Sequence, residues 1–301
     1  MEGIKIANAP CSWGALEFEL EAAAPDHLQV LREISETGYA GTELGDWGFM
    51  PTDPVQLRDV VSRSKLDLIG AFVPVPLVDD GAHKRGVADA LRVAGLMAHA
   101  DYPDAFIVLA DDNGTVLERT SHAGRITSDL SLDKWRWETF AAGAMRVAKA
   151  VKDEYGMRTV FHHHCGGYVE TPEELDTLMA LTDAQLLGLC FDTGHYAFGG
   201  GDPLDAVNKY QNRIWHMHFK DYNPHIGQLS HTNQWDYFES VKQGVFCELG
   251  KGNVDFEAIL NALGSSGYKG WIVVEQDVLP GMGTPKACAR NNRIYLEQLG
   301  L

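Results

Sequence analysis

Short apolar segments alternate with longer amphipathic segments along the whole chain of 301 residues. Eight of the apolar segments are rich in Ile, Val, Leu and Phe, a composition that predicts strands. The predicted strands cover residues 4–9, 41–44, 67–74, 106–110, 159–164, 186–192, 214–220 and 271–276. Continuous apolar strands of this kind are typical of a parallel sheet that is covered on both faces.

Helical periodicity follows these strands. The predicted helices cover residues 26–37, 54–65, 84–100, 132–155, 172–181, 255–263 and 285–299, and one more opens at Asp202-Pro203. Thr171 before Pro-Glu-Glu provides an N-cap, a proline at the first helical position and acids at the positive end of the helix dipole. Eight strand–helix units in succession predict an α/β fold, a single-domain (β/α)8 TIM barrel over residues 1–301.

An open doubly wound sheet is the competing architecture. It requires a glycine-rich phosphate loop after its first strand, but the segment at that place reads NAPCSWG and contains no GxGxxG. The barrel is therefore favoured. Residues 222–247 exceed the length of an ordinary strand–helix loop, and we expect them to form a lid or wall over the C-terminal face of the barrel.

Charge and cysteine content limit the partners and the compartment. The formal net charge is −17, so no excess of Lys and Arg is available for a polyanion, and we expect neither nucleic acid nor a membrane surface as partner. The five cysteines include no CxxC pair, which predicts neither a disulfide framework nor a thiolate zinc site. With no signal peptide and no apolar run of membrane-spanning length, we expect a cytoplasmic protein.

Polar residues recur where the predicted strands end, which is where TIM barrels carry their catalytic groups. The candidates, in strand order, are Glu43, His162, His164, Glu170, Asp192, His195, His216, His218, Lys220 and Glu275. Strand alternation places His216, His218 and Lys220 on one face. Burying three polar side chains beneath the helix layer would be costly, so we expect them to face the barrel mouth.

Carboxylate and imidazole groups from several strands, without cysteine, predict a divalent metal site that suits Mn²⁺, Co²⁺ or Mg²⁺ and also accommodates Zn²⁺. Single residues have structural explanations as well. His216 taken alone is more often a hydrogen-bonded wall residue, Asp192 is explained equally by a helix cap, and Glu43 is explained by an ion pair with a helix arginine. The convergence of strand-end residues from four units on one point of a closed barrel favours the metal site.

Six motifs carry a resemblance to a known family: NAPCSWG (8–14), GYAGTELG (38–45), FHHHCGGYVETPEE (161–174), FDTGH (191–195), HMHFKD (216–221) and VVEQD (273–277). Almost throughout its length the chain resembles the xylose isomerase-like TIM-barrel superfamily of sugar isomerases, epimerases and dehydratases, which also includes an endonuclease branch. The opening motif, GTELG and EQD are most similar to the inosose dehydratase branch.

This resemblance implies a divalent ion held by a Glu, Asp, His and Glu set, with Mn²⁺ or Co²⁺ favoured. Asp192, His218 and Glu275 match three of the ligands. Glu170 is taken as the fourth, and His162, at a position where many members have glutamate, is an alternative ligand or a substrate contact. Lys220 matches a position that commonly touches substrate.

The expected function is a metal-dependent carbon–oxygen lyase that dehydrates a keto-inositol or related keto-sugar through an enediolate. A ketose 3-epimerase or sugar isomerase is the alternative, because both reactions begin with removal of a proton next to a metal-bound carbonyl. Candidate bases are Glu43 and His164, candidate acids or polarisers are Lys220 and His195, and expected substrate contacts are Trp13, Trp47, His162 and His216.

Two further alternatives belong to other classes. An endonuclease would need a basic surface, and the charge of −17 argues against it. A non-catalytic sugar-binding barrel would bind its ligand independently of metal. The expected partner is therefore a small polyol or keto-sugar, and since barrels of this kind often pair, a homo-oligomer is compatible with the sequence.

Overall fold

A closed eight-stranded parallel barrel forms the centre of the molecule in this computed structural model, which describes residues 3–14, 25–279 and 281–301. The barrel strands follow one another around the ring in the order β1-β10-β7-β6-β5-β4-β3-β2, and β1 pairs with β2 to close it. Their bounds are β1 Ile4–Asn8, β2 Gly41–Glu43, β3 Asp67–Val75, β4 Phe106–Asp111, β5 Arg158–His162, β6 Leu187–Asp192, β7 Ile214–Phe219 and β10 Gly270–Val274. The predicted (β/α)8 TIM barrel is confirmed.

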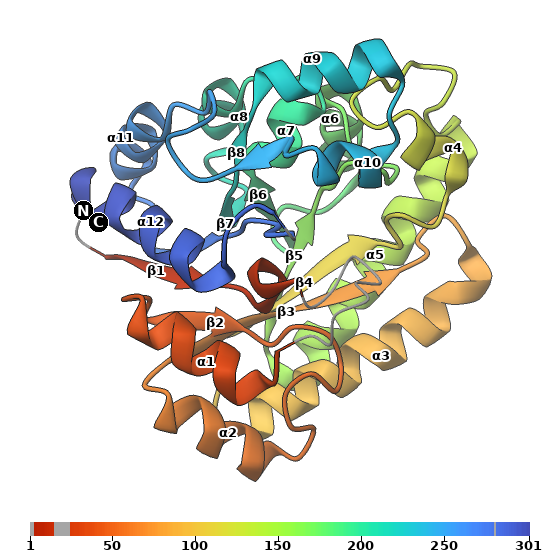
Figure 1. Cartoon of the computed structure of the whole chain (residues 1–301). Coiled ribbons are helices and arrows are strands. Elements are labelled where there is room, and N and C mark those ends of the chain that lie inside the picture. Colours follow the sequence, from red (N-terminus) through yellow and green to blue (C-terminus); the bar gives the residue numbers. More distant parts are fainter. Residues whose placement is uncertain (1–2, 15–24, 280) are drawn as a thin grey trace.

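Helices cover the outside of the barrel (Figure 1). The helices that were predicted are α1 His27–Glu36, α2 Pro54–Arg63, α3 Asp80–His99, α5 Lys134–Tyr155, α6 Pro172–Leu181, α8 Pro203–Tyr210, α11 Phe256–Ser266 and α12 Pro285–Gln298. Helix α3 begins four residues before the predicted start, because the Asp79 side chain accepts a hydrogen bond from the Gly81 N–H and caps the helix there. Helix α6 has the predicted cap, a complete capping box between Thr171 and Glu174.

Several short helices were not predicted from the sequence: η1 Pro10–Trp13, α4 Leu117–Ser121, α7 Thr193–Phe198, α9 Pro224–Asn233 and α10 Tyr237–Lys242. Helix α9 has a readable start, since Asn223 caps it and Pro224 occupies its first position. Each of the remaining four spans six residues or fewer. Helices of this length are too short for a periodic pattern of apolar residues to be recognised.

The long segment after β7 is a folded excursion. Its first strand, β8 (Asp221–Tyr222), pairs antiparallel with β9 (Phe246–Cys247), and α9 and α10 lie between them in sequence. Helix α10 contacts α4, and β8 contacts α7, so the excursion packs on the same side as those two short helices (Figure 1). Whether the segment moves as a lid stays a prediction.

The strands are buried on both faces, as their apolar sequences predicted. In β4, Ile107 and Leu109 belong to the large core between barrel and helices, while Phe106 and Val108 belong to a separate cluster with Val160 of β5. Among the described residues, no helix is both long and apolar enough to cross a membrane.

Candidate metal centre and its pocket

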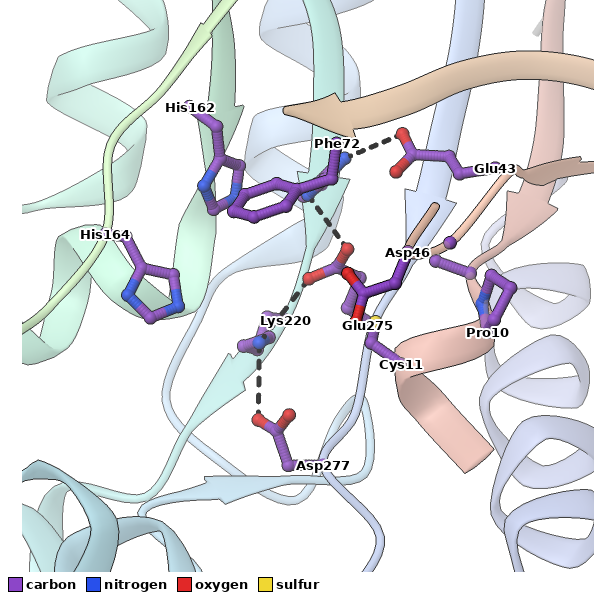
Figure 2. A pocket seen from close by; sticks show the side chains of 13 residues that line it. Pro10, Cys11, Glu43, Asp46, Phe72, His162, His164, Lys220, Glu275 and Asp277 are labelled. Carbon is purple, nitrogen blue, oxygen red and sulfur yellow. Dashed lines mark hydrogen bonds and ion pairs between the residues drawn. The ribbon is translucent and has the colours of Figure 1, made fainter. Parts of the chain in front are cut away.

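One pocket opens among the carboxyl ends of the barrel strands (Figure 2). It is lined by residues from both ends of the chain and from the middle: Ala9, Pro10, Cys11, Glu43, Gly45, Asp46, Phe72, His162, His164, His218, Lys220, Glu275 and Asp277. The strand-end prediction is thereby met for Glu43, His162, His164, His218, Lys220 and Glu275. Asp46, Phe72 and Asp277 join them in the lining.

Four buried side chains in and beside this pocket bring their ligand atoms together. His162, Asp192, His218 and Glu275 each offer one nitrogen or oxygen atom, and these four atoms all lie within 4.8 Å of one another. They come from β5, β6, β7 and the residue after β10. The register explains the convergence, because Asp192 is level with His218 across β6 and β7, and His218 is level with Val273 of β10.

The unpartnered atoms of this group fit a divalent cation. Both ring nitrogens of His162, Nδ1 of His218 and Oδ2 of Asp192 are buried without a hydrogen bond, and Nδ1 of His218 lies only 3.1 Å from Oε1 of Glu275. Buried polar atoms without partners are costly and rare, and two imidazoles with two carboxylates are a donor set that borderline divalent metals accept. These residues would therefore hold a metal ion.

Asp192 shows that a structural and a functional role occupy separate oxygens of one carboxylate. Oδ1 caps helix α7 by accepting the N–H of His195 at 2.8 Å, whereas Oδ2 is the unpartnered atom in the four-residue group. The residue is fully buried at the end of β6. The helix-cap explanation and the ligand explanation are thus compatible.

Glu170 was predicted as a metal ligand, and its position corrects that prediction. It belongs to none of the candidate metal groups among the described residues. Its Oε1 accepts the N–H of Gly124 at 2.6 Å and its Oε2 accepts the N–H of Gly166 at 2.8 Å. Both carboxylate oxygens are therefore used to join the segment after α4 to the β5–α6 loop, and His162 takes the fourth place in the group.

Burial raises the pKa of Glu170 to about 7, although the Gly166 and Gly124 N–H groups and Arg119 pull it down. The folded protein therefore binds a proton here that the unfolded chain releases above pH 4.5, so this residue makes stability fall as pH rises from about 4.5 to 7. Relative to Glu170→Gln, the wild type is expected to lose up to about 3 kcal/mol across that window and nothing further above it. Urea unfolding of both proteins from pH 4.5 to 8 measures this, and parallel stability curves would contradict it.

Glu43 stands at the end of β2 and contacts two histidines of β7. Its Oε1 lies 2.8 Å from Nε2 of His216 and 3.1 Å from Nε2 of His218. Burial raises the pKa of Glu43, but His218 and His216 outweigh this and lower the pKa to about 2. His216 is fully buried, and Nε2 of its ring contacts Glu43. It was predicted to contact the substrate, but it is not among the residues that line the pocket.

Glu275, Lys220 and Asp277 form a row of alternating charges beside the metal group (Figure 2). Lys220 Nζ lies 3.5 Å from Oε2 of Glu275 and 3.3 Å from Oδ2 of Asp277. Burial raises the pKa of Glu275, but His218 and Lys220 hold it well below its usual value. Asp277 lay in the EQD motif, and its place in the pocket lining and its contact with Lys220 make it part of the site.

Two histidine rings pack against each other beside Lys220. The rings of His164 and His195 have centroids 3.8 Å apart, and Nε2 of His195 lies 3.4 Å from Nζ of Lys220. Burial holds the pKa of His195 well below its usual value, so its ring is neutral. His164 lines the pocket and His195 does not, which means that His195 reaches a substrate only through its neighbours.

The excursion after β7 contacts one of the residues that line the pocket. The buried hydroxyl of Tyr237, at the start of α10, lies 3.3 Å from Nε2 of His164. On the other side of the same ring, Nδ1 lies 2.6 Å from the carbonyl oxygen of Cys165. His164 is therefore held from two sides.

The two tryptophans predicted as substrate contacts lie outside the lining of the pocket. Trp13 is buried in the main core, and its indole N–H donates to Oε2 of Glu33 at 2.7 Å. Trp47 is 40% exposed and stacks against the Arg92 guanidinium. Both rings are thus engaged elsewhere, and Phe72 is the aromatic side chain that faces the pocket (Figure 2).

Comparisons with known proteins agree with this architecture. The family model of the xylose isomerase-like TIM barrel matches residues 31–296. The inosose dehydratase of Geobacillus kaustophilus (strain HTA426) is 32% identical over 98% of this chain and 94% of its own length. That of Lacticaseibacillus casei is 31% identical over 98% of this chain and 96% of its own length.

A solved structure is similar in fold at much lower identity. The 3-keto-D-glucoside 4-epimerase of E. coli superposes with a TM-score of 0.70 at 14% identity, covering 98% of this chain and 99% of the epimerase. The sequence relatives, by contrast, match over nearly their full length at above 30% identity. This chain belongs to the xylose isomerase-like TIM-barrel family of enzymes and, within it, to the inosose dehydratase branch.

Proposed function

We propose that the protein is a metal-dependent carbon–oxygen lyase that removes water from a keto-inositol or a closely related keto-sugar. The observation that carries the proposal is the group of His162, Asp192, His218 and Glu275, whose buried ligand atoms converge within 4.8 Å of one another. The relatives named inosose dehydratase support the substrate class. An ion held by these residues, with Mn²⁺ or Co²⁺ favoured, would supply a Lewis acid for the substrate carbonyl oxygen.

His164 is assigned as the general base. Its Nδ1 faces the carbonyl oxygen of Cys165, and because a carbonyl only accepts, this nitrogen carries the ring proton. Nε2 therefore holds the lone pair, which faces the Tyr237 hydroxyl at 3.3 Å in a side chain that lines the pocket, so in the reaction the substrate takes the place of that hydroxyl. We assign to this nitrogen the proton that leaves the carbon next to the substrate carbonyl, a step that produces an enediolate.

Lys220 is assigned as the general acid. The electron pair of the enediolate forms a carbon–carbon double bond as the β-carbon–oxygen bond breaks, and the hydroxyl leaves as water with a proton from Nζ of Lys220. The carboxylates of Glu275 and Asp277 hold the ammonium group in place at 3.5 and 3.3 Å. Asp46 and Asp277 offer carboxylate oxygens to substrate hydroxyls in the same pocket.

The end of β5 supports dehydration over epimerisation. Epimerisation removes a proton from one face of a carbon and returns one to the other face, and we expect a carboxylate at the end of β5 for one of these transfers. In this protein the residue at the end of β5 is His162, and the nearest glutamate, Glu170, is bound to two backbone N–H groups. Without a carboxylate there, the pocket has one base, His164, and one acid, Lys220, whose proton can go to the leaving hydroxyl.

Incubation of the purified protein with 2-keto-myo-inositol and Mn²⁺ or Co²⁺ is expected to give a product that absorbs in the ultraviolet, because elimination yields an enone-type chromophore. Chelation by EDTA should stop the reaction and added metal should restore it. The proposal is contradicted if the protein instead interconverts a pair of ketose 3-epimers, with solvent deuterium entering the recovered substrate and no chromophore formed.

A further inference from the structure

The carboxylate of Glu43 receives two imidazole N–H groups on one oxygen. Oε1 is 2.8 Å from Nε2 of His216 and 3.1 Å from Nε2 of His218. A carboxylate oxygen only accepts hydrogen bonds, so both of these nitrogens carry their proton. Glu43 thereby determines which nitrogen of each ring is protonated.

For His218 this choice decides which atom is free to bind. With the proton on Nε2, the lone pair of the neutral ring lies on Nδ1. Nδ1 is the nitrogen 3.1 Å from Oε1 of Glu275, so a neutral ring with its proton on Nε2 turns its lone pair toward a carboxylate oxygen, an arrangement that a cation shared by the two atoms would stabilise. The side of the ring that carries the lone pair is thus the side that faces the four-residue group.

The backbone around Glu43 leaves space for its carboxylate beside Gly70. The pairing of β2 with β3 shifts register between Thr42 and Glu43, and Glu43 then lies opposite Gly70. A Cβ atom at Gly70 would stand 3.2 Å from Oε1 of Glu43, which is tighter than ordinary contact. A glycine at this position leaves room for the carboxylate to reach the two histidines.

We infer that Glu43 is a positioning residue, whose carboxylate holds the Nε2–H of His218 so that Nδ1 presents its lone pair to the metal. This inference rests on the proposed metal site. Hydrogen bonds from a ligand imidazole to a carboxylate are a recurrent means of orienting the ring, and their loss typically weakens metal binding 10–100-fold.

Glu43→Gln is the test variant, with Mn²⁺ alone as the probe. The amide group can donate to Nε2 of His218, which moves the ring proton to Nδ1 and blocks the ligand atom. We expect the Mn²⁺ dissociation constant, measured by isothermal titration calorimetry, to rise about 10–100-fold, and kcat to recover once Mn²⁺ is saturating. Asp46→Asn is the matched control, because Asp46 lines the same pocket but belongs to no candidate metal group among the described residues; its Mn²⁺ affinity should equal that of the wild type.

The outcomes separate this inference from the proposed function. If the wild type fails to bind Mn²⁺, the proposed function falls and the inference falls with it. If the wild type binds Mn²⁺ and Glu43→Gln binds it equally well, the inference alone is overturned. Equal Mn²⁺ affinity with a kcat that stays low at saturating metal would instead make Glu43 the catalytic base.

A measurement on the wild type covers the case in which Glu43→Gln does not fold. In the Zn²⁺-loaded protein labelled with ¹⁵N-histidine, long-range ¹H–¹⁵N spectra distinguish protonated from metal-bound ring nitrogens. We expect His218 to show a protonated Nε2 and a metal-bound Nδ1. The reverse assignment would overturn the inference.

Discussion

Asp192→Asn is expected to reduce turnover of 2-keto-myo-inositol about 10³-fold or more, while the protein stays folded. The amide oxygen can still accept the His195 N–H that Oδ1 accepts now, and Asn caps helices as well as Asp does. What disappears is the second carboxylate oxygen, the one that accepts no hydrogen bond, lies 3.8 Å from Nε2 of His162 and belongs to the four-residue group. Lewis-acid activation contributes several kcal/mol, and each 1.4 kcal/mol is about tenfold in rate.

The same variant should lose its stabilisation by metal. At a concentration 100 times the dissociation constant, a metal that binds only the folded wild type adds about 2.7 kcal/mol of stability, and Asp192→Asn should show almost none of it. Asp202→Asn is the matched control, because Asp202 caps α8 through the same type of contact but lies on the surface. Mn²⁺-dependent melting shifts of equal size in all three proteins would contradict a ligand role for Asp192.

Arg119→Met is expected to cost about 3–5 kcal/mol of unfolding free energy, the usual loss when one partner of a buried ion pair is removed. The guanidinium makes a two-pronged contact with Glu174, at 2.9 Å to Oε1 and 2.7 Å to Oε2. Its Nε also donates to the carbonyl oxygen of Gly167 at 2.7 Å. With Arg119 only 1% exposed, the variant leaves a buried carboxylate without its counter-charge.

Denaturant unfolding of two further proteins checks this explanation. Arg58→Met removes an exposed ion pair with Asp101 and should cost no more than about 1 kcal/mol. The double variant Arg119→Met/Glu174→Gln also removes the buried charge of Glu174, so it should regain part of the unfolding free energy that Arg119→Met loses. Gln at position 174 can still form the capping box of α6. If Arg119→Met costs as little as Arg58→Met, the buried pair does not stabilise the loop that follows His164.

All eight barrel strands could be predicted from the sequence, because a strand buried on both faces is a continuous apolar run that local composition reveals. The site was partly predictable for a related reason. Alternation along β7 placed His218 and Lys220 inward, and the structure has both in the pocket. The strand ends of β6 and β10 likewise lead to Asp192 and Glu275 of the four-residue group.

The residues after the strand ends were harder, because loop geometry depends on distant contacts. Glu170 follows β5 by eight positions, and its carboxylate is directed by the N–H groups of Gly124 and Gly166. Sequence spacing contains no trace of Gly124, which comes from the segment after α4. The same applies to Arg119, whose carboxylate partner lies 55 residues further along the chain.

The sequence by itself determined the barrel and three members of the candidate metal group, since period, strand number and strand-end position are local properties. Only the tertiary structure decided the fourth member, the aromatic side chain that faces the pocket and the position of Glu43 against two histidines. All three features depend on hydrogen bonds between distant residues. Trp13 donates to Glu33, and Glu170 accepts from two glycines. Glu43 contacts His216, which lies 173 residues further along the chain. Residues so far apart in sequence come into contact only when the strands close into a barrel, so local sequence patterns do not predict these pairings.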